Sequence, residues 1–488
     1  MEGRPAAEPA AFLISSGPMR ALAAVLAASS VCLAAGAPAP DPKPPAASGS
    51  SVYEDMAVDL LRGYLQVDTT NPPGNELKSA LFLKEAMERE GIPVVVDEFA
   101  PGRANLLATL KGSGAKRPLV LANHMDVVPA DPARWSVPAF AGLVKDGAIY
   151  GRGAEDMKTE GILQLVALVR AHREGGPLSR DILFLATADE EAGFLGALRA
   201  VSPEGWRDRL KQAEYLITEG GENLVDAAGK VQYFGVETAE KGPFWLKLQT
   251  KGTPGHGSRP IEDSALNRLV RALDRVRRHH TAMKVLPSVQ RFFADQADQV
   301  EDPRSRWYRD ITAALRDPAA ARELYDDREV SALLRNTISI TVVRAGYKTN
   351  VIPGTAEAEL DVRLLPGEDP QAFLAEMRGV IDDPTVEIVP PATFRPPNDS
   401  PTDSDLFRTV ESVLRRHHPG APVTTKMLTG ATECVLYRPL GIACYGFTPL
   451  LTTSDELATV HGDDERVSEA TVRASTPIFY EVVRELAR

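Results

Sequence analysis

His124 and Asp126 are the residues of this sequence whose types and spacing most directly suggest chemistry. They are separated by one residue and follow an apolar run at 118–122. Such a run predicts a buried strand that delivers polar side chains to the edge of a sheet. In an extended continuation, side chains two residues apart lie on the same face. One of the pair could bind a metal while the other orients it, although solvated His/Asp pairs also occur at strand ends.

Four further polar clusters follow along the chain. Asp156 lies in a glycine-rich approach to an apolar helix, where its alternative role is to cap that helix. Glu190 and Glu191 end a run of three acids after a predicted strand, and the alternative there is a solvated acidic loop. Glu219 follows another apolar strand, and His461 comes from near the C-terminus.

Together these clusters supply two histidines and several carboxylates. This ligand set suits a pair of divalent ions, with zinc the first expectation and cobalt or manganese as possible substitutes. A bridging carboxylate, with one histidine and one carboxylate for each metal, is the inventory of a two-metal hydrolase. An adjacent glutamate is then left to act as general base.

The elements that must position these residues follow an alternating pattern. Helical patterns cover 53–90, broken by a turn at 69–74, and five predicted strands and one helix follow. The strands are expected at 93–97, 105–110, 119–122, 181–186 and 215–218, and the helix at 161–172. This alternation predicts an α/β domain with a mixed, mostly parallel sheet covered on both faces. Ligands of such sheets bind beyond the carboxyl ends of the strands.

Near residue 240 the pattern changes to that of a smaller domain. Its predicted order is strand, helix, two strands, helix and strand, at 244–250, 264–278, 337–344, 355–364, 370–381 and 385–389. This order predicts a ferredoxin-like α+β domain. We therefore expect a first domain split into 53–240 and 394–488, with the smaller domain inserted at 241–393. Residues 287–335 look like an insertion within it, which could cover a dimer edge or shape the cleft.

Length and composition agree with two globular domains. The 488 residues exceed what one core usually supports, and 43% hydrophobic with 25% charged residues is ordinary globular composition. A net charge of −12 argues against nucleic acid or an anionic membrane surface as a partner.

The N-terminus has the character of a targeting segment. Met19 and Arg20 precede an apolar run at 21–35, which small residues follow. This pattern predicts a signal peptide over 1–37 and a Pro-rich linker over 38–52, and therefore export to the periplasm or the medium. The apolar run is shorter than the roughly 20 residues of a membrane span, and a lipoprotein anchored at Cys32 is the minor alternative. Cys434 and Cys444 are expected to be buried free thiols, because neither their number nor their spacing suggests a disulfide-dependent fold.

An ordered set of seven motifs resembles one known family. The motifs are H-M-D at 124–126, G-R-G-x-x-D-M-K at 151–158, D-E-E-x-G at 189–193, T-E-G-G at 218–221, G-H-G-S-R-P at 255–260, N-V-I-P at 350–353 and H-G-D-D-E-R at 461–466. From about residue 53 to the C-terminus, the chain resembles the M20 family of zinc peptidases and amidohydrolases. That family includes carboxypeptidase S-like enzymes, aminoacylases and succinyl-diaminopimelate desuccinylases.

The resemblance implies a role for each motif residue. His124 and Glu191 would bind separate zinc ions, Asp156 would bridge them, and Glu219 and His461 would complete the two coordination spheres. It also implies three catalytic roles: Asp126 would orient His124, Glu190 would be the general base and acid, and His256 would stabilise the transition state. In dimeric members of the family, that last histidine reaches the active site of the partner subunit. The resemblance further implies that 53–240 and 394–488 form the catalytic domain and that 241–393 is a lid or dimerisation domain.

Three further residues resemble substrate-binding positions. Asn350 and Arg363 match such positions, and a guanidinium suits a substrate carboxylate, although Arg363 could also be an exposed strand arginine. Gly430 lies in a loop at 429–434 that resembles the Gly-Gly-Thr-Asp loop of the family. Ala431 and Glu433 depart from that pattern, so the substrate preference of relatives does not transfer.

The expected function is hydrolysis of an amide bond. The first expected substrate is a short peptide with a free C-terminal carboxylate, and the alternative is an N-acyl amino acid. A non-catalytic binding protein of the same fold would require the loss of a ligand or of the base, and none is missing. A two-metal phosphoesterase is a further alternative, because similar metal pairs serve phosphoryl chemistry. A homodimer through the smaller domain is possible, and a stable membrane span is not expected.

Overall fold

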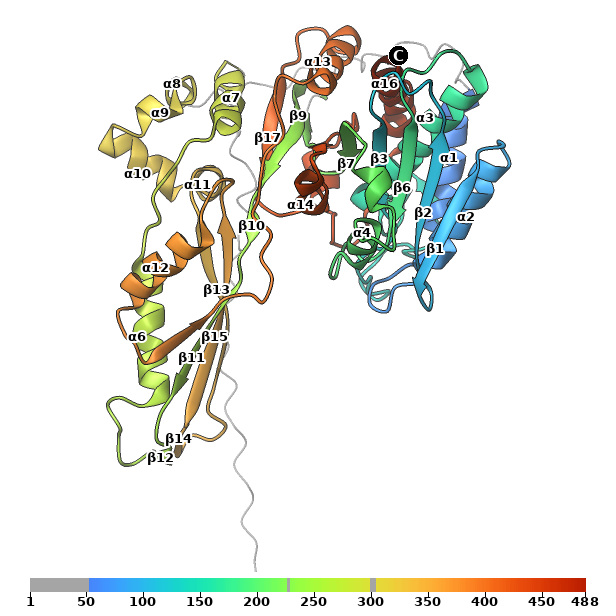
Figure 1. Cartoon of the computed structure of the whole chain (residues 1–488). Coiled ribbons are helices and arrows are strands. Elements are labelled where there is room, and N and C mark those ends of the chain that lie inside the picture. Colours follow the sequence, from blue (N-terminus) through green and yellow to red (C-terminus); the bar gives the residue numbers. More distant parts are fainter. Residues whose placement is uncertain (1–51, 226–228, 299–303) are drawn as a thin grey trace, which may run out of the picture.

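The computed structural model of the chain describes residues 52–225, 229–298 and 304–488 (Figure 1). The predicted signal peptide and all but the last residue of the predicted linker lie outside these ranges. None of the helices in the described ranges is both long and apolar enough to cross a bilayer. Two domains are visible, and the sequence-based limits of 53–240, 241–393 and 394–488 remain predictions.

A nine-stranded mixed sheet forms the centre of the first domain. Its order is β1-β2-β6-β3-β7-β18-β9-β17, with β8 beside β9. The strands are β1 (Val94–Ala100), β2 (Arg103–Leu110), β3 (Leu119–His124), β6 (Ile182–Thr187), β7 (Tyr215–Thr218), β8 (Asn223–Val225), β9 (Val231–Glu240), β17 (Val423–Leu428) and β18 (Ala443–Gly446). The central strands β6, β3, β7 and β18 pair in parallel, so their carboxyl ends meet at one edge of the sheet.

Helices cover both faces of this sheet, as the apolar runs predicted. Strand β3 is buried along its whole length, and its side chains alternate between two cores. Leu119 and Leu121 join the core under α1 (Val52–Leu65), α2 (Glu76–Glu88), α3 (Thr159–Glu174), α13 (Asp405–His417) and α16 (Glu469–Ala487). Val120 and Ala122 join the opposite core under α4 (Leu195–Ala200), α5 (Arg207–Leu210) and α14 (Cys434–Tyr437). Burial on both sides explains why the strand is continuously apolar.

A small three-stranded sheet joins two segments that are far apart in the sequence. Strand β19 (Arg466–Ser468) pairs antiparallel with β5 (Ala148–Tyr150), which in turn pairs with β4 (Leu143–Lys145). Arg466 lies opposite Tyr150 in this ladder. The segment that follows His461 is therefore tied to the segment that leads toward Asp156.

The second domain has the strand order of the predicted ferredoxin-like motif. Strands β11 (Leu246–Lys251), β13 (Thr337–Ala345), β15 (Thr355–Leu364) and β16 (Val386–Val389) lie in the order β13-β15-β11-β16, and the short β10 (Gly242–Pro243) extends the β11 side of β15. Helices α6 (Ala265–Arg278) and α12 (Pro370–Ile381) cover one face of this antiparallel sheet (Figure 1). Ser264 and Asp369 cap these helices, because each side chain accepts a hydrogen bond from a backbone N–H of the first turn.

The insertion at 287–335 packs against the first sheet. Its helices are α7 (Pro287–Gln296), α8 (Ser305–Tyr308), α9 (Ile311–Ala314), α10 (Pro318–Asp326) and α11 (Arg328–Leu334). Phe293 and Leu324 of the insertion share a core with Ala239 of β9 and Met427 of β17. The Thr425 hydroxyl of β17 also donates to the Ser288 carbonyl at 2.6 Å. The insertion thus covers the end strand of the nine-stranded sheet.

The chain passes to the second domain and back at one place. Ala239 and Asp399 form an antiparallel bridge, and the Ser400 N–H donates to the Thr238 carbonyl at 2.8 Å. Beside this crossing the buried Lys241 ammonium donates to the Arg335 carbonyl at 2.8 Å. Burial lowers the pKa of Lys241 to about 7.

The prediction of two free thiols is wrong, because Cys434 and Cys444 form a disulfide. Cys434 begins α14 and Cys444 lies in β18, and the helix folds back so that their Cα atoms are 5.7 Å apart. That separation suits a disulfide. Both residues are fully buried in the core on the α14 face of the sheet.

Removal of the disulfide is expected to destabilise the first domain. Replacing both residues, Cys434→Ala with Cys444→Ala, should lower the free energy of unfolding by about 2–4 kcal/mol, because the unfolded chain gains freedom. Urea unfolding followed by circular dichroism measures the change. Wild-type protein with a reductant should lose similar stability, whereas the reductant should not affect the double variant. Equal stability of wild type and variant would contradict the expectation.

Candidate metal centre

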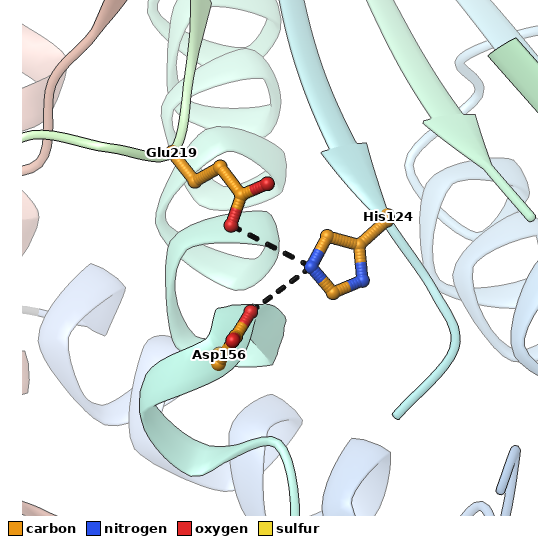
Figure 2. A group of neighbouring side chains, drawn as sticks. All are labelled: His124, Asp156 and Glu219. Carbon is orange, nitrogen blue, oxygen red and sulfur yellow. Dashed lines mark hydrogen bonds and ion pairs between the residues drawn. The ribbon is translucent and has the colours of Figure 1, made fainter. Parts of the chain in front are cut away.

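Three predicted ligands meet at the carboxyl ends of the parallel strands (Figure 2). His124 ends β3, Glu219 follows β7, and Asp156 lies in the short helical segment η1 (Ala154–Lys158) that leads into α3. The His124 Nε2 atom is 3.0 Å from Asp156 Oδ1 and 3.6 Å from Glu219 Oε2. These side chains form a first group that could hold a metal ion.

A second group shares Asp156 with the first. The His461 Nε2 atom is 2.9 Å from Asp156 Oδ2 and 3.2 Å from Glu191 Oε2. In each group the potential ligand atoms lie within 4.8 Å of one another. Because each oxygen of Asp156 faces a different histidine, its carboxylate lies between the two groups.

The charges and donor atoms fit a pair of divalent cations. Burial and then the charge of nearby Glu219 raise the pKa of Glu190 well above its ordinary value. The buried Oε1 atom of Glu191 has no hydrogen-bond partner. Imidazole nitrogens with carboxylate oxygens form a donor set that zinc and related ions accept.

Asp156 does not cap the helix that follows it. No side-chain hydrogen bond caps η1 or α3, and the Asp156 carboxylate contacts the two histidines instead. The turn before it requires glycine, since Gly153 has φ of 86° and a Cβ there would lie 2.6 Å from Val127 Cγ1. The helix-cap alternative for Asp156 is therefore wrong.

Asp126 contacts His124 mainly through its backbone. The His124 Nδ1 atom is 3.1 Å from the Asp126 backbone carbonyl and 3.7 Å from the carboxylate. The carboxylate accepts hydrogen bonds from the backbone N–H groups of Glu190 at 3.0 Å and Glu191 at 3.1 Å. The side chain of Asp126 thus holds the acidic loop, an arrangement that the His-x-Asp spacing did not predict.

Sequence analysis missed Asn71, which connects two of these carboxylates. Its Nδ2 atom donates to Asp126 Oδ2 at 2.8 Å and to Asp189 Oδ1 at 2.9 Å. Asp189 also pairs with Arg103, whose Nε lies 2.8 Å from the fully buried Glu76. Asn71 is followed by two prolines and a glycine. Because asparagine is common in such turns, its presence gave no reason to assign it to the site.

The loop that contains Gly430 follows β17. A Cβ on Gly430 would meet only the Leu428 side chain at 3.7 Å, which is ordinary contact. Glu433 turns inward: it accepts from the Thr187 hydroxyl at 2.9 Å and from the Tyr437 hydroxyl at 3.1 Å. Burial raises the pKa of Glu433 to about 8.

The remaining predicted residues lie on the second domain. His256 in β12 (Gly255–His256) pairs with Val351 in β14 (Val351–Ile352), and Asn350 directly precedes β14. Figure 1 places β12 and β14 at the far end of that domain, well away from β3 and β7. Arg363 on β15 pairs with Asp361 at 2.7 Å, so its guanidinium is already engaged. The structure does not bring these residues to the ligand groups of the same chain.

Comparisons with known proteins agree with the motif resemblance. The family model described as Peptidase family M20/M25/M40 matches residues 120–485. The N-fatty-acyl-amino acid synthase/hydrolase of Homo sapiens is 28% identical over 410 residues, or 80% of this chain and 77% of that protein. Aminoacylase-1 of Sus scrofa is 27% identical over 441 residues, or 89% of this chain and 96% of that protein. A solved M20 family metallo-carboxypeptidase from Sulfolobus solfataricus shares the fold, with a TM-score of 0.67 and 18% identity over 88% of this chain and 99% of that one.

Metal binding is expected to release protons near neutral pH. Hydrogen bonds to Asp156 and Glu191 raise the pKa of His461 to about 10. Burial opposes protonation of His124, but Glu219 and Asp156 outweigh it and raise the pKa of His124 as well. Both imidazoles are thus protonated below these raised pKa values, and a divalent cation must displace the protons. Affinity should therefore increase as the pH rises toward about 10, the raised pKa of His461.

Calorimetric titration of zinc into metal-free protein measures this release. The apparent enthalpy should differ between buffers of different ionisation enthalpy, and His461→Ala should release fewer protons. The same enthalpy in all buffers would contradict the expectation.

Proposed function

The chain belongs to peptidase family M20/M25/M40 and is a hydrolase, and on that premise we propose that it is a two-zinc enzyme that hydrolyses the amide bond of N-acyl amino acids. The observation that carries this proposal is the carboxylate of Asp156, which lies between two histidine-containing groups beside the acidic pair Glu190 and Glu191. A shared carboxylate of this kind suits a two-metal hydrolase.

The residues divide into ligands and a base. His124, Asp156 and Glu219 would hold one zinc ion, and Asp156, Glu191 and His461 the other. When bound, the pair supplies Lewis-acid polarisation of the substrate carbonyl and acidification of water. Glu190 takes the proton of the attacking water on its carboxylate and delivers it to the departing amine nitrogen. Asp126 keeps Glu190 in place through the hydrogen bond to its backbone N–H.

We propose that His256 stabilises the oxyanion only after it is brought to a metal centre. Its imidazole is exposed, and its Nδ1 atom is 2.8 Å from the Ser258 hydroxyl, which leaves Nε2 free of hydrogen bonds within the described chain. Because its domain tip is remote from the ligands of its own chain, a second copy paired through the second domain is the arrangement we propose.

The proposed substrate differs from the first expectation from sequence. The N-fatty-acyl-amino acid synthase/hydrolase and aminoacylase-1, which match most of this chain, are both named for N-acyl amino acids. The short peptide with a free C-terminal carboxylate is the second candidate, since the family is described as a peptidase family.

We also propose that the protein is exported. The N-terminal pattern supports this location. The disulfide between Cys434 and Cys444 supports it independently, because structural disulfides persist mainly in oxidising compartments.

Glu190→Gln is expected to lower kcat by about 10²- to 10⁴-fold, because the amide cannot accept the proton of water. The variant should retain its zinc, measured by metal analysis, since Glu190 is not a proposed ligand. The control is Glu191→Gln, which should lose zinc as well as activity. An unchanged hydrolysis rate in Glu190→Gln would exclude this residue as the base.

Substrate choice can be tested on matched amides. N-acetyl and N-dodecanoyl derivatives of one amino acid are compared with dipeptides that end in the same residue. We expect kcat/KM to be at least about tenfold higher for an acyl derivative, a difference of about 1.4 kcal/mol in transition-state stabilisation. Faster cleavage of the dipeptides would establish the second candidate. Hydrolysis of none of these amides, with turnover of a phosphate ester, would overturn the proposal.

A further inference from the structure

The Glu465 carboxylate is buried beside the backbone turn that carries Asp156. Only 1% of the residue is exposed. Its Oε1 atom accepts from the backbone N–H groups of Glu155 at 2.9 Å and Asp156 at 3.1 Å. Its Oε2 atom accepts from the Gly153 N–H at 2.8 Å and from Arg152 Nη1 at 2.7 Å. One carboxylate thus receives four hydrogen bonds from this turn.

The same contacts fix the loop that carries His461. Glu465 lies four residues after His461, and its backbone carbonyl accepts from the Gly151 N–H at 2.9 Å. Arg152 Nη2 donates to the Gly462 carbonyl at 2.6 Å, directly after the histidine. The side chains of Arg152 and Glu465 therefore link the Asp156 turn to the His461 loop from both directions.

All four partners of this carboxylate are hydrogen-bond donors. A carboxylate offers about four lone-pair sites on two oxygens, whereas an amide replaces one oxygen with an NH₂ group that is itself a donor. Glutamine has nearly the same shape as glutamate. Its NH₂ group would, however, face N–H donors where the carboxylate oxygen now accepts their hydrogen bonds. Buried donors left without an acceptor are costly, which restricts the position to a carboxylate.

We propose that Glu465 is a positioning residue that sets the separation of Asp156 and His461, and through it the affinity of the second metal-binding group. No hydrogen bond or ion pair of the described structure joins the Glu465 carboxylate to the imidazole of His461. It acts through the backbone of Asp156 and through the loop of His461. The predicted effect on metal affinity rests on the proposed two-metal function. The four hydrogen bonds that the Glu465 carboxylate accepts, called the clamp below, can be tested without metal.

The neighbouring Asp463 provides a matched control in the same acidic run. Its carboxylate pairs with the exposed Arg134 at 2.7 Å, and no hydrogen bond or ion pair of the described structure joins it to the Asp156 turn. Asp463→Asn therefore makes the same change from carboxylate to amide without disturbing the clamp. Val410→Ala, at a fully buried position in α13, controls for general loss of stability.

Hydrogen exchange of the metal-free protein, in the presence of a chelator, tests the clamp directly. In Glu465→Gln the amides of Gly153, Glu155 and Asp156 should exchange faster than in wild type. In Asp463→Asn and Val410→Ala, their exchange relative to the rest of the domain should match wild type. Unchanged protection in Glu465→Gln would overturn the clamp, whatever the enzyme does.

Calorimetric titration with Zn²⁺ alone tests the consequence for the second group. The zinc affinity of the group that contains His461, identified as the one that His461→Ala removes, should fall about 10- to 100-fold in Glu465→Gln, as expected when a group that orients a ligand is lost. Glu465→Asp, which keeps the charge on a shorter side chain, should recover part of that loss. If Glu465→Gln does not fold, the Glu465→Asp affinity decides the question, and a value equal to that of Asp463→Asn would refute the positioning role.

Failure of the proposed function has a different signature. Wild-type protein that binds no zinc and cleaves no amide would refute the two-zinc hydrolase while the exchange result still measures the clamp. Wild-type protein that binds two zinc ions, with Glu465→Gln binding them equally well, would refute only the role of Glu465.

Discussion

The position of the Asp156 carboxylate between two imidazoles is the constraint on which the rest of the site depends. Its oxygens lie 3.0 Å from the His124 Nε2 atom and 2.9 Å from the His461 Nε2 atom. A shift of this one side chain would therefore change its distance to both imidazoles. The carboxyl groups of Glu190 and Glu219 lie nearby, and burial raises the pKa of each. Concentrated carboxylates of this kind are tolerable only where cations or donors compensate them. The backbone around Asp156 is accordingly fixed from several directions.

The architecture supplies these groups from separate parts of the chain. Parallel strands β3 and β7 bring their carboxyl ends to one edge of the sheet, and the small β4-β5-β19 sheet brings the C-terminal loop to the same place. The second domain, in contrast, presents His256 at its far tip. Both groups that could hold a metal ion therefore lie within the first domain, whereas His256 could reach them only after a movement of its domain or from another copy.

Strand periodicity and motif order predicted much of this arrangement. The apolar runs located the ends of β3 and β7, and therefore the neighbourhood of His124 and Glu219, because parallel strands share an edge. Local pattern could not predict contacts that arise only in the folded chain. The disulfide depends on α14 folding back over β18. Asn71 is a common turn residue, so its contact with Asp126 could not be inferred from its type. The Asp126 carboxylate accepts from a backbone N–H group of the acidic loop, and every residue type except proline offers such a group.

The bridge between Ala239 and Asp399 holds the two ends of the inserted second domain close together. The chain leaves the nine-stranded sheet and returns to it at adjacent positions, so the whole second domain is an excursion with closely spaced ends. Insertions of this topology are tolerated because a short connection can replace them without stretching the host. A chain shortened across these two positions would keep all nine strands of the host sheet, but it would expose the apolar surface of β9 and β17 that the insertion helices now bury.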